Sequence, residues 1–250
     1  MTTSRHHHDI FEQSATKTAE RGRASGGLAI GLNNLVYTKT ELISASDEFI
    51  FIKTMIGETT VIIGIVYINQ KKNTKVILDK IDEELTKINN KYYNSNIIIG
   101  GDFNARIADK GEIDKYQLPE QNYIFTKKRE SQDTVINERG RDLIDFAEKN
   151  DLFIINGRFP SDTPADFTFF NTQGKSVIDL VLCNSEALLK IIDVKVCNSI
   201  TLSDHFPISL TINFTTKLNQ SDKYYFPTFS RLIGLTFTKQ SKEARKTRKY

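Results

Sequence analysis

Several apolar runs in the sequence predict β-strands, most of them buried. Residues 60–68 and 96–100 are largely apolar, as expected for strands covered on both faces. Residues 48–54 alternate between phenylalanine and isoleucine over much of their length, which also predicts a strand. Shorter apolar runs predict further strands at 28–32, 152–155, 167–170, 176–183, 191–196 and 208–214.

Two segments have helical periodicity instead. Residues 76–89 repeat apolar side chains on one face, at Ile77, Ile81, Leu85 and Ile88. Residues 137–149 do the same with Leu143, Phe146 and Ala147. Residues 108–135 are polar and irregular, which predicts a long surface loop. Because strands outnumber helices, the pattern favours two β-sheets packed face to face with helices outside.

The length of 250 residues suits a single α/β domain with flanking segments. We expect a mobile segment at 1–25, the domain at 26–216, and a tail at 217–250 that ends in a run rich in lysine and arginine. The 34 basic and 31 acidic residues give a net charge of only +3, which does not by itself indicate a nucleic-acid partner.

The composition does not indicate a secreted or membrane protein. Cys183 and Cys197 are too few for a disulfide framework, and a reducing compartment suits them. No run approaches the ~18 apolar residues of a membrane span. The first residues also lack the apolar stretch of a signal peptide. We therefore expect a nuclear or cytoplasmic monomer without a membrane partner.

The first candidate for chemistry follows the strand at 96–100, where Asp102 and Asn104 lie in the sequence Gly-Gly-Asp-Phe-Asn. Glycine lets the backbone turn sharply and approach a ligand closely. Residues two apart in an extended segment point the same way, so this carboxylate and amide could together hold a water and a phosphate oxygen. An ordinary turn after a strand is the alternative.

The next two candidates complement each other. Asp179 lies inside the apolar run 177–183, where a charge is costly unless it has a partner. His205, in Ser-Asp-His-Phe-Pro, is the side chain best able to exchange a proton near neutral pH. We therefore expect Asp179 to pair with His205. A strand-end cap and a lone surface histidine are the alternatives.

Taken in order, these three motifs resemble those of the endonuclease/exonuclease/phosphatase superfamily, and the likeness extends from about Gly26 to Phe214. Further stretches are similar to the endonuclease domains of non-LTR (LINE-like) retrotransposons. These stretches are Arg-Ala-Ser-Gly-Gly-Leu-Ala-Ile at 23–30, Asn137 with Gly140, Asn156-Gly157, and Thr168-Phe169. The resemblance implies a four-layered α/β sandwich in which the three motifs meet at one sheet edge.

The resemblance also implies roles for single residues. Asp102 would act on the attacking water and Asn104 would position the phosphate. Asp179 would orient His205, which acts on the charge of the transition state. The remaining implied residues are Tyr67 at the scissile phosphate, Asp204 at Mg²⁺ or Mn²⁺, and Asn156, Thr168 and Ser203 at the substrate. Core packing is the alternative for Tyr67, and strand packing is the alternative for Thr168.

The N-terminus departs from the family pattern. The family's domain opens with a strand carrying Asn and a second strand carrying a metal-binding Glu. Only 25 residues precede Gly26 here, and neither Glu12 nor Glu20 lies in an apolar strand sequence. We therefore expect an N-terminally incomplete domain with weakened metal binding and activity.

Three functions stay open at this point. The first is a metal-dependent DNA endonuclease of the retrotransposon type, which in such elements accompanies a reverse transcriptase. The second keeps the chemistry but acts on an inositol phosphate or a phospholipid, although no apolar membrane-facing loop is evident. The third is an inactive remnant that binds nucleic acid.

Overall fold

The computed structural model describes residues 8–14, 27–33, 38–114, 118, 123–199, 203–213 and 231–235. In chain order its elements are β1 (His8–Gln13), β2 (Leu28–Asn33), β3 (Thr38–Ala45), β4 (Phe49–Ile56), β5 (Thr59–Tyr67), α1 (Thr74–Lys91), β6 (Asn96–Asp102), α2 (Glu138–Lys149), β7 (Phe153–Ile154), η1 (Pro160–Asp162), β8 (Phe169–Asn171), β9 (Gly174–Ser176), β10 (Asp179–Cys183), α3 (Ser185–Leu188), β11 (Ile191–Val196), β12 (Ile208–Ile212) and β13 (Arg231–Leu235).

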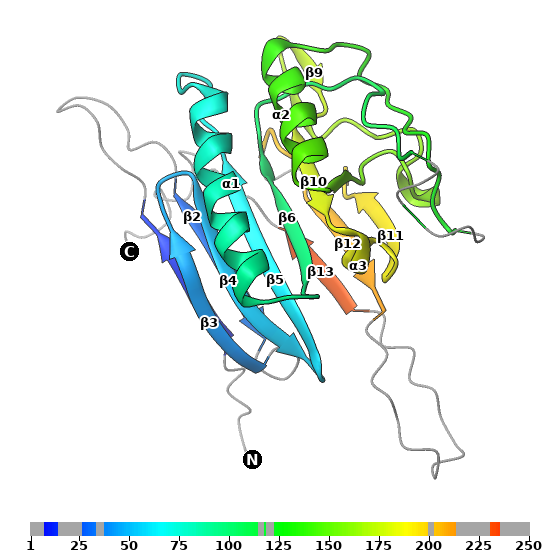
Figure 1. Cartoon of the computed structure of the whole chain (residues 1–250). Helices are drawn as coiled ribbons and strands as arrows, with labels where there is room; N and C mark the ends of the chain where they lie inside the picture. Colours follow the sequence, from blue (N-terminus) through cyan, green and yellow to red (C-terminus); the bar gives the residue numbers. More distant parts are fainter. Residues whose placement is uncertain are drawn as a thin grey trace, which may run out of the picture.

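A six-stranded mixed sheet forms the centre of the fold, in the order β3-β4-β5-β6-β10-β7 (Figure 1). Strands β5 and β6 are parallel, and α1 supplies the crossover that a parallel pair requires. The other pairs in this sheet are antiparallel. The apolar runs of β5 and β6 are explained by their central position, since both of their faces are covered.

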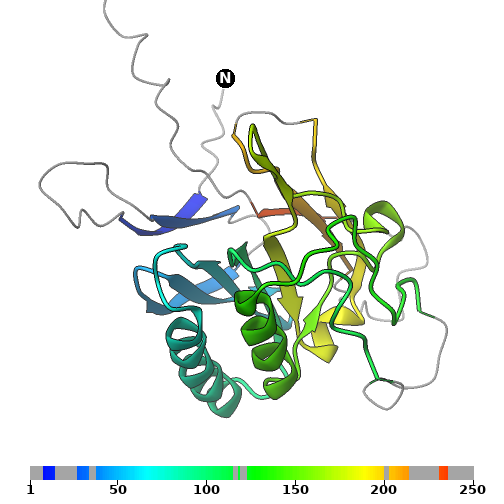
Figure 2. The same cartoon turned by 90° about the horizontal axis from the view of Figure 1, so that it is seen from above.

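The two faces of this sheet bound two separate apolar cores. Helices α1 and α2 cover one face, and their apolar stripes pack against it (Figure 1). The β1–β2 pair and the β11–β12–β13 sheet lie over the other face (Figure 2). The expected α/β sandwich of two packed β-layers with helices outside is therefore confirmed. In the described residues, both long helices lie on the six-stranded sheet.

Both long helices begin at asparagine caps, close to the predicted positions. The Asn73 side chain accepts a hydrogen bond from Val76 N at the start of α1. The Asn137 side chain does the same for Gly140 N in α2. A Cβ atom on Gly140 would lie only 1.9 Å from the carbonyl oxygen of Arg106. Glycine therefore allows the start of α2 to approach the segment that follows β6.

Two strands correct the predicted flanking segments. Within the segment expected to be mobile, β1 pairs with β2, and Phe11 packs against the core between the sheets. Glu12 thus lies in a strand, opposite Ala29, although its side chain is exposed. Within the predicted tail, β13 pairs with β12. The rest of the 1–25 segment and of the tail, its basic end included, lies outside the described residues. None of the described helices is long and apolar enough to cross a membrane.

Candidate active site

Asp102 and Asp179 lie side by side at one edge of the six-stranded sheet. Asp102 ends β6, Asp179 begins β10, and the antiparallel register pairs the two residues directly. A Cβ atom on Gly101 would lie 1.9 Å from the carbonyl oxygen of Val66, so glycine is needed for β6 to approach β5. Asp102 is 8% exposed and Asp179 is fully buried.

Two buried polar residues hold Asp179 in place. The Thr168 hydroxyl accepts the N–H groups of Ile178 and Asp179, at 3.1 and 3.0 Å. The Asn156 amide bonds to Asp179 O and Val181 N. Both residues are 0% exposed, so their placement does not fit the predicted direct contact with substrate. Their polar groups are used instead to fix the strand that carries Asp179.

His205 is brought to this edge by the loop before β12. The backbone of this loop bonds to the β8 segment, through Phe170 N to Asp204 O and Phe206 N to Thr168 O. The Phe169 ring packs against the imidazole, with centroids 4.8 Å apart. The β8 segment therefore positions His205 both by backbone hydrogen bonds and by contact with the Phe169 ring.

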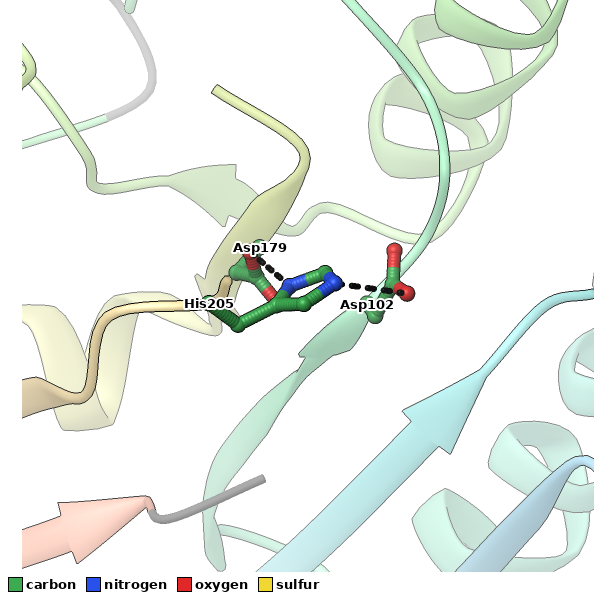
Figure 3. Close-up of side chains that lie close together, drawn as sticks. All are labelled: Asp102, Asp179 and His205. Carbon is green, nitrogen blue, oxygen red and sulfur yellow. Dashed lines mark hydrogen bonds and ion pairs between the residues drawn. The ribbon is translucent and has the colours of Figure 1, made fainter. Parts of the chain in front are cut away.

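The imidazole of His205 lies between the two aspartates (Figure 3). Its Nδ1 is 2.9 and 3.0 Å from the carboxylate oxygens of Asp179, and its Nε2 is 4.0 Å from Oδ2 of Asp102. An ionised Asp179 can only accept hydrogen bonds, so Nδ1 carries the proton in this pair. Nε2 is consequently directed at Asp102.

The charges around His205 favour its protonated form. Burial alone lowers the pKa of His205, but the hydrogen bond and charge of Asp179 outweigh it. The charges of Asp102 and Asp204 act in the same direction, and the pKa of His205 is raised above 6.5 overall. Burial raises the pKa of the Asp179 carboxyl, and the hydrogen bond from His205 opposes that rise.

Asn104 lies beside Asp102, but not in the extended geometry that the sequence predicts. Its φ is +49°, because the strand ends at Asp102 and the chain turns sharply there. The backbone N–H of Asn104 donates to Asp102 Oδ1 at 2.9 Å, and its side-chain amide donates to Ile68 O. Gln70 Nε2 donates to Asn104 Oδ1 at 2.8 Å. Asn104 is thus held from three sides.

The other predicted site residues surround this group. Tyr67 ends β5 in register with Asp102, and its half-buried ring packs against the core between the sheets. Ser203 supports the histidine loop, since its hydroxyl bonds to the Asp204 carboxylate and to His205 N. Asp204 is half-buried next to His205.

The donor groups at this edge fit a divalent cation. Ligand atoms of Asp102, Asp179 and His205 lie within 4.8 Å of one another. Asp204, the predicted metal ligand, is not one of these three. However, both Asp179 oxygens already face His205, which leaves Asp102 as the carboxylate better placed for an ion. Since Asp102, Asp179 and Asp204 all act on one imidazole, negative charge is in excess and a divalent cation would balance it.

An ion pair that the sequence does not predict connects the segments next to β6 and β10. Arg106 makes a bidentate contact with Asp133, at 2.9 and 2.6 Å, and Asp133 also accepts the N–H of Val177 at 3.0 Å. The pair therefore ties the segment after Asp102 to the segment before Asp179. Asp133 lies in a long polar loop, where no local pattern distinguishes it from neighbouring acids.

The fold and the site define the class of protein. A family model described as endonuclease-reverse transcriptase matches residues 61–209, which is more than half of the chain. The chain therefore belongs to this family and to the endonuclease/exonuclease/phosphatase superfamily. A search of curated proteins finds no match.

Solved structures with the same fold include the endonuclease domain of TRAS1, a telomere-specific non-LTR retrotransposon. The identity is 17% and the TM-score 0.53, over 82% of this chain and 78% of that one. The AP endonuclease LMAP from Leishmania major has a TM-score of 0.57 at 11% identity, over 81% of this chain and 69% of that one. The 3′-5′ exonuclease NExo from Neisseria meningitidis has a TM-score of 0.50 at 14% identity, over 83% of this chain and 80% of that one. At such identities the likeness concerns the fold.

Proposed function

We propose that this chain is a metal-dependent DNA endonuclease that hydrolyses backbone phosphodiesters as a monomer. The observation that supports this most is the group formed by His205, Asp179 and Asp102, in which an oriented imidazole faces a second carboxylate. The TRAS1 and LMAP structures, both named as endonucleases, share the fold.

In the proposed reaction, Asp102 orients the attacking water, which loses its proton to solvent. The new bond joins the water oxygen to phosphorus as the bond to the 3′-oxygen breaks. The departing 3′-oxygen takes a proton from solvent, which leaves a 3′-hydroxyl and a 5′-phosphate. His205, kept protonated by Asp179, stabilises the negative charge of the transition state. The Asn104 amide has a second N–H that can donate to a phosphate oxygen. Tyr67, next to Asp102 in the sheet, contacts the same phosphate.

Asp102 and Asp204 are the carboxylates proposed to hold Mg²⁺ or Mn²⁺. When bound, such an ion stabilises charge on the phosphate and on the leaving oxygen. Asp179 is excluded from this role by its full burial and by its two contacts with His205.

Nicking of supercoiled plasmid by the full chain, with Mg²⁺ or Mn²⁺, tests this function. We expect His205→Ala to lower the nicking rate by about 10²- to 10⁴-fold, since it removes the proton-bearing group. Asp102→Asn should cause a comparable loss. Asp145→Asn, on the exposed side of α2, is the matched control and should leave the rate unchanged.

The other outcomes separate the remaining functions. A folded chain that binds DNA in a salt-dependent way and never nicks it would instead be an inactive nucleic-acid binder. Hydrolysis of an inositol phosphate or a phospholipid without any nicking would assign the site to a different substrate.

A further inference from the structure

Arg139, in the first turn of α2, reaches across to the turn that follows β5. Its Nη2 donates to the carbonyl oxygen of Asn69 at 2.9 Å and to that of Lys72 at 2.7 Å. These two carbonyls lie at either end of the turn between β5 and α1. One guanidinium group therefore holds the whole turn against the start of α2.

The turn held by Arg139 carries Gln70, and Gln70 connects it to the catalytic group. Gln70 Nε2 donates to Asn104 Oδ1 at 2.8 Å, and Asn104 N donates to Asp102 Oδ1 at 2.9 Å. Asn104 also has a φ of +49°, a left-handed conformation that asparagine adopts more readily than most residues. Hydrogen bonds at both ends of this turn, joined by its backbone, thus connect α2 to Asp102.

The position of the Arg139 guanidinium suits hydrogen bonding to backbone carbonyl oxygens better than binding of a phosphate. Its Nη1 has no accessible surface and no hydrogen-bond partner among the described residues. Burial lowers the pKa of Arg139, and the charge of Asp102 opposes that effect, which puts the two groups within electrostatic reach. A phosphate could not contact Nη1 unless the side chain moved.

We propose that Arg139 is a positioning residue of the active site. It fixes the turn after β5 so that Gln70 holds Asn104, and with it Asp102, in the geometry needed for catalysis. This inference rests on the proposed nuclease function. A geometry that is looser by about 1 Å lowers the rate of a chemical step by up to ~10²-fold, with much less effect on substrate binding.

The test compares Arg139→Met with Arg141→Met in the full chain. Both variants lose one positive charge from the same helix and keep an aliphatic stem. The exposed Arg141 side chain makes no hydrogen bond or ion pair with a described residue. We expect Arg139→Met to lower kcat by about 10- to 100-fold with KM almost unchanged. Arg141→Met should change neither. Should Arg139→Met fail to fold, Gln70→Met interrupts the same series of bonds and should lower kcat selectively.

Two kinetic outcomes would overturn the proposal. If KM rises, kcat is retained, and the salt dependence of DNA binding becomes weaker, then Arg139 contacts a phosphate directly. If Arg139→Met has wild-type kcat and KM, then the turn does not need the guanidinium.

A measurement without catalysis separates this proposal from the nuclease function. The side-chain amide signals of Gln70 and Asn104, observed by NMR, report the bond between them. They should shift and exchange faster with water in Arg139→Met, and stay as in the wild type in Arg141→Met. Unchanged signals in both variants would refute the positioning role. A wild-type chain that cleaves no DNA, but shows the selective shift, would refute only the nuclease.

Discussion

Two of the regions in which the described residues bury charged side chains differ in kind, and one of the two has features expected of an active site. Asp179 is fully buried at the sheet edge, and its partner is the imidazole of His205. Arg129 and Arg158 are as deeply buried beneath the irregular segments between β6 and β8. Burial of a charge therefore does not by itself identify function.

The two arginines donate to backbone carbonyl oxygens, although Arg129 Nη2 is buried without a hydrogen-bond partner among the described residues. Arg158 donates to the carbonyls of Ile154, Thr126, Lys127 and Gly111. Arg129 donates to the carbonyls of Asn156, Ala108 and Lys110. Burial lowers the pKa of each guanidinium to about 10, so both stay charged at neutral pH. These arginines fasten irregular segments to the end of β7.

The difference lies in the partner. Carbonyl oxygens cannot change their protonation, so the hydrogen bonds that hold these two arginines do not titrate, and they serve structure. His205 can gain or lose a proton near neutral pH, and its side chain stays 11% exposed between two carboxylates. A buried charged group indicates a catalytic site when its partner can titrate and is partly exposed to solvent.

The largest effect that would sharpen this comparison is expected for Asp179→Asn. The amide keeps the size of the carboxylate but removes its charge, so the imidazolium loses its stabilising partner. We expect the nicking rate to fall by about 10²- to 10⁴-fold, with the fold intact by circular dichroism.

The same variant should change the titration of His205. Because the bond and charge of Asp179 raise the pKa of His205, Asp179→Asn should lower it. An NMR titration can measure this, with His205→Ala assigning the signal among the four histidines. An unchanged pKa would mean that Asp179 does not determine the protonation of His205.

The opposite result is expected in the arginine region. Arg158→Met keeps an aliphatic stem but leaves buried carbonyls without donors, which should lower the free energy of unfolding by about 3–5 kcal/mol. Urea unfolding measures this loss, and the nicking rate per folded molecule should change far less. A severe loss of rate at intact stability would show that this region participates in catalysis.

Local patterns in the sequence predict the central part of this fold well. Strands β4, β5 and β6 and helices α1 and α2 were predictable because each has an apolar run or stripe that needs a core. Strand β3 was missed because it is an edge strand with polar residues such as Lys39 and Glu41. The strands β1 and β13 lie in segments that are polar overall.

The candidate site, like the fold, could be predicted only in part from the sequence. The cost of burying Asp179 predicts a partner, and His205 is that partner. Three features depend on tertiary contacts and could not be predicted: the left-handed backbone of Asn104, the internal roles of Asn156 and Thr168, and the ion pair between Arg106 and Asp133. Sequence patterns reveal the periodicity of apolar side chains and the free-energy cost of burying a charge. The three features above depend instead on contacts between loops that are far apart in the sequence.

A buried acid in the arginine region gives the last and smallest test. Burial raises the pKa of Asp162 from 3.8 to about 6, against the opposing bonds from Gly157 N and Asp166 N and the charge of Arg129. Between these two pH values the folded chain holds a proton that the unfolded chain has released. The contribution of Asp162 to stability is therefore fully present below about pH 4 and is lost as pH rises through 6.

We accordingly expect the free energy of unfolding of the wild type to fall by about 2 kcal/mol relative to that of Asp162→Asn between pH 4.5 and 7.5. Asp162→Asn removes one hydrogen-bond acceptor, and the free-energy cost of that loss is the same at every pH. The change with pH in the stability difference between the two chains therefore reports only the titration of Asp162. Urea unfolding of both chains across this range measures it. If the wild type instead becomes more stable than Asp162→Asn as the pH rises, then Arg129 and Asp162 form an ion pair. The arginine region would then resemble the Asp179–His205 pair more closely, and its separation from the active site would rest on solvent access alone.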